Sequence, residues 1–210
     1  MDKICLFGAS GHGKVIKEII ESTGNEVIAF VDDHPVSNQL LGVSVFETRA
    51  LKDFTTRKFI ISIGNNATRK KISEKFDIKY TKAVHDKAMV SNSVLVNEGT
   101  VIMAGAIVNS DSLIEEFCIL NTKSSLGHDS KMKKFSSLAP NATTGGHVNI
   151  GEFSAVSIGA TIIQSIKIGK HSVIGAGALV LDDIGNNLIA FGSPAKDIKE
   201  RQIGESYLAK

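Results

Sequence analysis

A histidine followed directly by an aspartate, His128 and Asp129, is the pair in this sequence best suited to acid–base chemistry. A neutral imidazole accepts a proton near neutral pH, and an adjacent carboxylate orients the ring and stabilises its protonated form. We therefore expect His128 to act as a general base with Asp129 as its partner. The acidic neighbour distinguishes His128 from His85, His147 and His171, for which an exposed turn residue without a catalytic role is the simpler interpretation.

A glycine-rich loop near the N-terminus is a second candidate site. The loop GASGHG, residues 8–13, follows an apolar run and precedes apolar residues at helical spacing. Without Cβ atoms, successive N–H groups can face an anionic group at the N-terminus of the following helix. His12 has no obvious packing role there, which favours contact with a ligand. The spacing is G-x-x-G-x-G, unlike the G-x-G-x-x-G of dinucleotide folds, so simple tight turns remain an alternative.

The elements that would position this loop form an α/β domain over residues 1–82, expected to be Rossmann-like. Three apolar runs, 4–7, 26–31 and 59–63, end in the glycine loop, in Asp32-Asp33 and in Gly64-Asn65-Asn66. In parallel βαβ units the ligand binds at the carboxyl ends of the strands, and Asp32 stands where a dinucleotide fold places its ribose-binding acid. A domain of about 80 residues holds only one mononucleotide half, so a nicotinamide dehydrogenase is excluded. A site for one nucleotide or nucleotide-sugar remains.

The elements that would position His128 follow a six-residue period, which indicates a parallel β-helix of hexapeptide repeats over residues 83–195. Small residues recur four positions after the aliphatic ones, as expected where a coil turns a tight corner. A β-sandwich, the alternative, would show turn signals every roughly 8 to 12 residues. Three hexapeptides make one coil, which places His147 above Asp129. The aliphatic series, broken at Thr144, is Val84, Val90, Val96, Ile102, Val108, Ile114, Leu120, Leu126, Met132, Leu138, Ile150, Val156, Ile162, Ile168, Ile174 and Val180.

Composition excludes several classes of function. The net charge of +2 over 210 residues, with scattered lysines, gives no reason to expect nucleic acid as a partner. The two cysteines, Cys5 and Cys118, lie in apolar stretches and are expected to be buried thiols in a reducing compartment. No apolar run is long enough to span a membrane, so we expect a cytoplasmic protein without a membrane partner. The charged segment 196–210 is expected to be a short helix or a disordered tail.

Six motifs in series resemble the nucleotide-sugar N-acetyltransferases of the PglD/NeuD group: GASGHG, FVDD, IGNN with Arg69 after it, ILNT at residues 119–122, the His–Asp pair, and GSPAK at residues 192–196. The resemblance implies a homotrimer of left-handed β-helices that uses acetyl-CoA and no metal. The acceptor it implies is the 4-amino group of a UDP- or dTDP-linked 4-amino-4,6-dideoxysugar. Some relatives carry Glu where this chain has Asp129, and one has a second active-site histidine at the position of Ser137.

The resemblance also assigns residues to roles. His128 would be the base, Asp129 its partner and Asn121 a nearby polar contact. The nucleotide-sugar would be held by Gly8, Ser10, Gly11, His12, Gly13, Asp32, Asp33, Gly64, Asn65 and Asn66. Acetyl-CoA would lie between the coils of two subunits, against Gly146, Ala160, Gly175, Gly177, Gly192, Ser193 and Pro194.

Our mechanistic hypothesis is direct attack of the sugar amine on the acetyl thioester, with His128 taking the proton. A backbone N–H of Gly145 or Gly146 would receive the oxyanion. Cys118, which faces the interior, is not expected to carry the acetyl group. Two other functions remain open: O-acetylation of a sugar hydroxyl, as of a sialic acid, and a non-catalytic scaffold that senses nucleotide.

Overall fold

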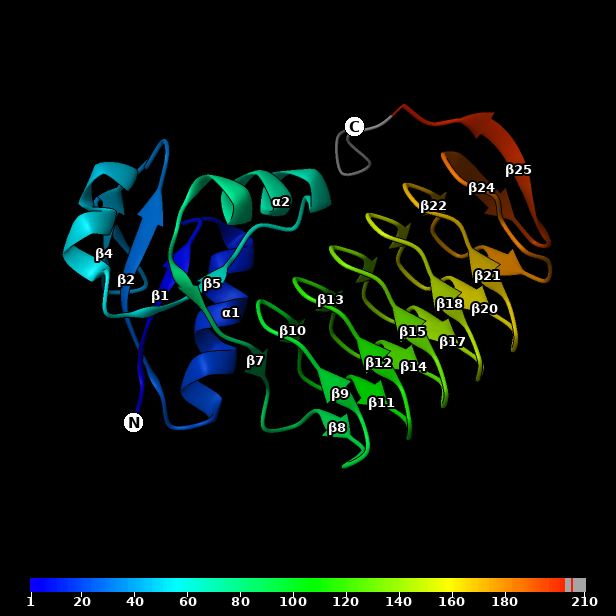
Figure 1. The fold of residues 1–210 in the computed structure, drawn as a ribbon, viewed down its shortest axis with the longest axis horizontal. Helices are drawn as coiled ribbons and strands as arrows, with labels where there is room; N and C mark the ends of the chain where they lie inside the picture. Colours follow the sequence, from blue (N-terminus) through cyan, green and yellow to red (C-terminus); the bar gives the residue numbers. More distant parts are fainter. Residues whose placement is uncertain (203–204, 206–210) are drawn as a thin grey trace.

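The computed structural model describes residues 1–202 and 205 as an α/β domain followed by a solenoid (Figure 1). The first domain contains a sheet in the order β3-β4-β2-β1-β5-β6, in which only the β3–β4 pair is antiparallel. The carboxyl ends of β1, β2 and β5 therefore meet at one edge. The elements are β1 (Lys3–Phe7), α1 (Gly11–Ser22), β2 (Glu26–Asp32), β3 (Gln39–Leu40), β4 (Val43–Glu47), η1 (Thr48–Phe54), β5 (Lys58–Ile61), α2 (Asn66–Lys75) and β6 (Lys79–Tyr80).

The solenoid is a left-handed parallel β-helix with three faces, as expected. The first face contains β7 (Ala83–Val84), β10 (Val101–Ile102), β13 (Ile119–Leu120), β16 (Ser137–Leu138), β19 (Ala155–Val156) and β22 (Val173–Ile174), extended by β24 (Leu188–Gly192) and β25 (Ala195–Glu200). The second face contains β8 (Met89–Val90), β11 (Ile107–Val108), β14 (Ser125–Leu126), β17 (Thr143–Thr144), β20 (Thr161–Ile162) and β23 (Leu179–Val180). The third face contains β9 (Leu95–Val96), β12 (Leu113–Ile114), β15 (Lys131–Met132), β18 (Asn149–Ile150) and β21 (Lys167–Ile168).

Three kinds of corner join these faces. We call the turn from the first face to the second the first corner (121–124 and its equivalents in other coils), the next the second corner (127–130, 145–148), and the turn back to the first face the third corner (115–118, 133–136, 151–154, 169–172). Each corner lies opposite one face of the triangular coil. The second corner, which carries His128, is opposite the first face.

The aliphatic period corresponds to the solenoid core. Ile102, Leu120 and Leu138, for example, are fully buried in one apolar cluster. Thr144, the one break in the series, has a structural reason, because its hydroxyl accepts a hydrogen bond from the N–H of Gly127 at 3.0 Å. The hydroxyls of the small corner residues bond successive coils together, as Ser112 does by donating to the carbonyl of Gly127 at 2.9 Å. Side chains that fill the interior and hydroxyls that join the coils thus both follow the repeat.

The C-terminal segment differs from the expectation of a helix or disordered tail. Residues 195–200 form β25, which pairs antiparallel with β24 on the first face. The segment AKDIKE carries apolar residues only at 195 and 198, three positions apart, so its sequence lacks the alternation that predicts a strand. Residues 203–204 and 206–210 of the expected tail lie outside the described residues.

The α/β domain packs on the solenoid through both of its α-helices. Helix α1 places Ile16 and Ile19 in a shared apolar cluster with Val101 and Ile119 of the first face. The Arg69 side chain of α2, 1% exposed, donates hydrogen bonds to the carbonyls of residues 117 and 135 at 3.1 and 3.0 Å, on two successive third corners. The domain is therefore held against the first face and the third corner, and Figure 1 shows α2 above the edge of the coils.

The third corner also contains a ladder of stacked rings. Phe117, Phe135, Phe153 and His171 follow one another with ring centroids 5.1, 5.2 and 4.7 Å apart, and Tyr80 meets Phe117 edge-on at 5.0 Å. Ring stacking adds to the burial of apolar surface where α2 covers the coils.

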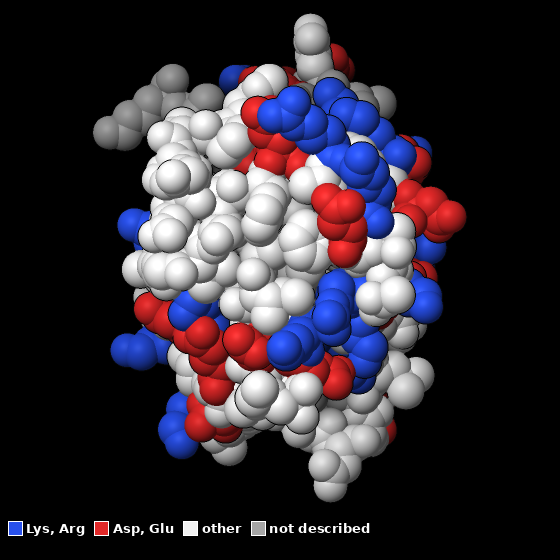
Figure 2. Space-filling view, turned by 90° about the vertical axis from the view of Figure 1, so that its left-hand side faces the viewer, with Lys and Arg blue, Asp and Glu red and all other residues white. Residues whose placement is uncertain are grey.

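The end of the molecule formed by the α/β domain does not present a single field of positive charge. Figure 2 shows a broad uncharged area there, bordered by acidic and basic residues in alternation. Within the described residues, no helix has both the length and the apolar character that a membrane span requires.

Candidate functional site

His128, Asp129 and His147 are brought together on the second corner. Nδ1 of His128 lies 2.6 Å from Oδ2 of Asp129, and Nε2 of His147 lies 3.9 Å from the same oxygen. The two imidazole rings meet edge to face with centroids 5.1 Å apart. The hydrogen bond from His128, and then the electrostatic influence of His147 and His128, lower the pKa of the Asp129 carboxyl. Asp129, although shorter than Glu, therefore reaches the histidine and remains ionised near neutral pH.

The backbone of the second corner explains this arrangement. Asp129 and His147 have left-handed backbones, with φ of 55° and 57°, and the His147 N–H donates to the His128 carbonyl at 2.8 Å. A Cβ at Gly146 would lie only 2.5 Å from Nε2 of His128, so the ring of His128 rests on this glycine. Gly146, which was expected to contact acetyl-CoA, lies directly beneath the imidazole of His128.

The glycine loop divides into packed and open positions. A Cβ at Gly8 would meet Ile63 at 2.7 Å, and one at Gly13 would meet the Gly8 carbonyl at 2.7 Å, so both glycines are required by the fold. A Cβ at Gly11 would meet nothing within 4 Å. Ser10, the N-cap of α1, makes no capping hydrogen bond with its side chain. Gly11 and Ser10 therefore form the part of the loop that faces open space.

Asp32 closes the loop from the neighbouring strand. One carboxylate oxygen accepts the Ala9 N–H at 2.8 Å and the other accepts the His34 N–H at 2.9 Å. Asp32 therefore supports the loop directly, whereas Asp33 is exposed at the same edge of the sheet.

His12 is largely buried in the loop, and its Nε2 has no hydrogen-bond partner among the described residues. Burial, followed by the nearby charge of Arg69, lowers the pKa of His12 from 6.5 to about 4. The imidazole is therefore neutral across the physiological range. A buried ring nitrogen without a partner is costly unless a ligand or water satisfies it.

The side chain of His12 lines a groove of about 900 Å³ that runs along the first face. Gly64, Asn121 and Ser137 line the groove beside His12, and Ser157, Gly175 and Phe191 line it farther along the solenoid. A cavity of this size is ample for a small-molecule ligand. The groove begins at the carboxyl edge of the α/β sheet and runs toward β24, so it connects the expected nucleotide site with the expected acetyl-CoA site.

Asn121 lies on the first corner, in the groove with His12, and not on the second corner with His128. The structure therefore does not place Asn121 beside the base within one chain, because β14 separates the two corners. The hexapeptide period alone could have predicted this separation, because the two residues are seven positions apart and one side of a coil spans six residues.

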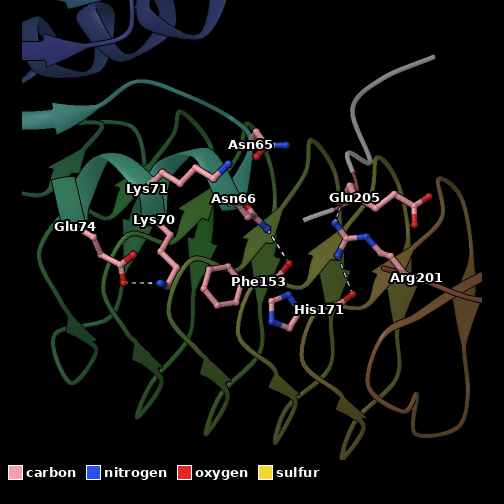
Figure 3. A pocket seen from close by; sticks show the side chains of 10 residues that line it. Asn65, Asn66, Lys70, Lys71, Glu74, Phe153, His171, Arg201 and Glu205 are labelled. Carbon is pink, nitrogen blue, oxygen red and sulfur yellow. Dashed lines mark hydrogen bonds and ion pairs between the residues drawn. The ribbon is translucent and has the colours of Figure 1, made fainter. Parts of the chain in front are cut away.

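Asn65 and Asn66 have structural partners and line a separate cavity of about 560 Å³ between α2 and the third corner (Figure 3). Asn65 caps α2 by accepting the Thr68 N–H at 2.9 Å. The Asn66 side chain, 2% exposed, donates to the carbonyl of Phe153 at 3.1 Å and accepts from Arg69 at 2.8 Å. Asn66 therefore joins α2 to the solenoid, and it lines a different cavity from the groove that His12 lines.

The residues expected to contact acetyl-CoA lie in several places. Gly175 lines the groove, and Gly177 has a left-handed backbone with open space around it. Residues 192–194 are exposed at the turn between β24 and β25. Ala160 is fully buried in the solenoid core, so its side chain cannot face a ligand. Alanine occurs at this position because the corner is tight, whereas the sequence analysis interpreted the small residue as part of a binding surface.

Sequence reasoning did not single out Ser157, Ile158 and Phe191, all of which line the groove. Ile158 and Phe191 are 58% and 44% exposed. The sequence did contain a signal that the first face is a binding surface. Outward positions of the first face carry small residues, Ser137 and Ala155, whereas the equivalent positions of the third face carry Lys131 and Lys167.

Sequence comparisons with known proteins find relatives of this chain. Residues 3–76 match the family model described as the PglD N-terminal domain. A UDP-N-acetylbacillosamine N-acetyltransferase from Bacillus subtilis (strain 168) is 35% identical over 114 residues, which are 50% of this chain and 52% of the relative. The chain thus matches about half the length of this curated relative.

Solved structures match over nearly the whole chain. A histidine-to-asparagine variant of perosamine N-acetyltransferase from Caulobacter crescentus, in complex with CoA and GDP-perosamine, is 31% identical with a TM-score of 0.91, and the match covers 95% of this chain and 98% of that one. The acetyltransferase domain of PglB from Neisseria gonorrhoeae FA1090, in complex with acetyl coenzyme A, is 31% identical with a TM-score of 0.88, over 93% and 98% of the two chains.

Proposed function

Because the chain belongs to the PglD-type nucleotide-sugar acetyltransferases, we propose that it transfers the acetyl group of acetyl-CoA to the 4-amino group of a nucleotide-linked 4-amino-4,6-dideoxysugar. The observation that carries this proposal is that the structural match covers 98% of perosamine N-acetyltransferase, a protein solved with CoA and GDP-perosamine. The solenoid of this chain also presents a hydrogen-bonded His–Asp pair. Within the proposal, UDP or dTDP is the expected nucleotide.

The nucleotide-sugar would bind at the carboxyl edge of the α/β sheet. Ser10 and Gly11 offer open space at the N-terminus of α1, where unpaired N–H groups and the helix dipole favour a phosphate. Nε2 of the neutral His12, which has no hydrogen-bond partner among the described residues, would form a hydrogen bond to the ligand there. The sugar would then extend into the groove toward Asn121 and Ser137.

His128 would act as the general base. Its Nδ1–H donates to Asp129, which fixes the tautomer that leaves a lone pair on Nε2. The sugar nitrogen attacks the thioester carbonyl carbon, His128 takes the proton from that nitrogen, and the C–S bond breaks as the proton passes to the CoA sulfur. The Gly145 N–H already donates to the Ile162 carbonyl at 2.8 Å, which leaves the N–H of Gly146 as the candidate for the oxyanion.

The site would be completed by a second copy of the chain. The groove lies on the first face, whereas His128 projects from the second corner, on the opposite side of the same triangular coil. One chain therefore cannot place its own His128 in its own groove. A cyclic assembly, in which the second corner of each copy meets the first face of the next, brings base and substrates together, and the homotrimer expected from the family is of this kind.

Release of free CoA, measured with a panel of acceptors, tests the proposed function. Amino-sugar nucleotides should support turnover, whereas free sialic acid, a hydroxyl acceptor, should not. His128→Ala should lower kcat by roughly 10²–10⁴-fold, the usual contribution of a positioned base. A decrease below about threefold would remove His128 from the mechanism, and equal turnover with sialic acid would contradict N-acetylation.

A further inference from the structure

We propose that His128, Asp129 and His147 form a binding site for a divalent transition-metal ion such as Zn²⁺, and that the bound ion inhibits the enzyme. One potential ligand atom from each residue lies within 4.8 Å of the other two. Nδ1 of His128 is 2.6 Å from Oδ2 of Asp129, and Nε2 of His147 is 3.9 Å from the same oxygen. Ligand atoms around a tetrahedral zinc ion are about 3.3 Å apart, a value between these two separations.

The stacking of coils holds the three residues at this spacing. Asp129 and His147 are each the left-handed residue of their corner, eighteen positions apart in one column, and a backbone hydrogen bond of 2.8 Å joins His147 to the residue before Asp129. The side chains are 57%, 45% and 60% exposed. Because they are exposed, small rotations of side chains can reach the metal geometry without movement of the backbone.

The chemistry of the donor set selects the ion. Two imidazole nitrogens and one carboxylate oxygen suit Zn²⁺, Co²⁺, Ni²⁺ or Cu²⁺, whereas Mg²⁺ and Ca²⁺ prefer sites made of oxygen ligands. Three protein ligands leave a fourth position for water. The ion would take the place of the proton between Nδ1 of His128 and Asp129, and the imidazole, which stays neutral, then carries its proton on Nε2.

Inhibition follows from the location of the site and depends on the proposed role of His128. With the ion on Nδ1 and the proton on Nε2, the ring has no lone pair left to accept a proton from the sugar amine, and the ion neutralises the carboxylate that would support a protonated ring. The ion therefore inhibits by blocking the base, and the metal-free enzyme is the active form.

The experiment uses untagged full-length protein treated with EDTA and then dialysed. Co²⁺ binding is followed by its visible absorption, Zn²⁺ binding by calorimetry, and Mg²⁺ serves as the control ion. His147→Asn should weaken Zn²⁺ binding by roughly tenfold or more, since even partners of metal ligands contribute that much. His34→Asn, which changes an exposed histidine of the α/β domain, should leave the affinity unchanged.

Turnover is measured on the same samples, each variant relative to its own metal-free rate. The wild-type rate should fall over the Zn²⁺ range in which binding occurs and return with EDTA, and His147→Asn should need correspondingly more Zn²⁺. Absence of Co²⁺ absorption, or equal weakening by His34→Asn and His147→Asn, would overturn the site. Zn²⁺ binding without loss of rate would overturn the inhibition and count against His128 as the base, even if acetyl transfer itself is established.

Discussion

Gly146→Ala should impair catalysis without unfolding the protein, because the three heavy atoms nearest to the new methyl group all belong to the ring of His128. The added Cβ would lie 2.5, 2.6 and 2.9 Å from Nε2, Cε1 and Cδ2 of the ring, where ordinary contacts begin at 3.4 Å. The imidazole must therefore move by about 1 Å, and a misplacement of that size lowers a rate by roughly 10²-fold. The ring is 57% exposed and can swing outward, so the free energy of unfolding should change by less than about 1 kcal/mol.

Gly127→Ala is the matched control on the same corner. Its Cβ would lie 2.1 Å from the Gly145 carbonyl oxygen, which is backbone and cannot rotate away. This variant should lose about 1–3 kcal/mol of stability or more. Steady-state kinetics and urea denaturation of both variants distinguish the two effects. Retention of more than a third of kcat by Gly146→Ala, or a loss of stability equal to that of Gly127→Ala, would refute this account of the corner.

Three further outcomes are expected. Arg69→Met removes the donor to two buried corner carbonyls and should cost about 3 kcal/mol of stability in chemical denaturation; a loss below about 1 kcal/mol would contradict its role. Because the pKa of His12 is about 4 when folded and 6.5 when unfolded, the unfolded chain binds the extra proton between these values, so stability should fall by up to about 3 kcal/mol as the pH is lowered from 6.5 to 4. His12→Asn should flatten this slope, and an unchanged slope would argue against it. Burial raises the pKa of the Cys118 thiol to about 12, so Cys118→Ala should retain turnover and the folded protein should resist alkylation there; loss of acetyl transfer would point to an acyl-enzyme.

The solenoid could be predicted from the sequence because one aliphatic residue per hexapeptide must fill the same position in every coil. The same repeat explains why His147 lies beside Asp129. Thr144 interrupted the pattern for a reason that only the three-dimensional contact reveals, since its hydroxyl serves the backbone of Gly127.

The candidate site was less accessible to sequence reasoning, because residue type does not state which way a side chain faces. Small residues at corners, such as Ala160, fit a ligand surface as well as a crowded interior, and the structure places this one in the interior. Asn66 follows a strand at a position where a ligand contact was expected, yet its side chain donates a hydrogen bond to a backbone carbonyl of the solenoid. Gly8 and Gly11 belong to one motif, but only the first is required by packing.

Mixing two inactive variants tests most directly whether the base of one copy serves the groove of another. His128→Asn lacks the base, and Gly11→Glu fills the open part of the glycine loop. After unfolding and refolding together in equal amounts, each site combines two chains at random, so activity should return to about a quarter of the wild-type value. If co-refolded mixtures remain as inactive as the separate variants, while each variant forms the normal oligomer, base and groove do not come from different chains.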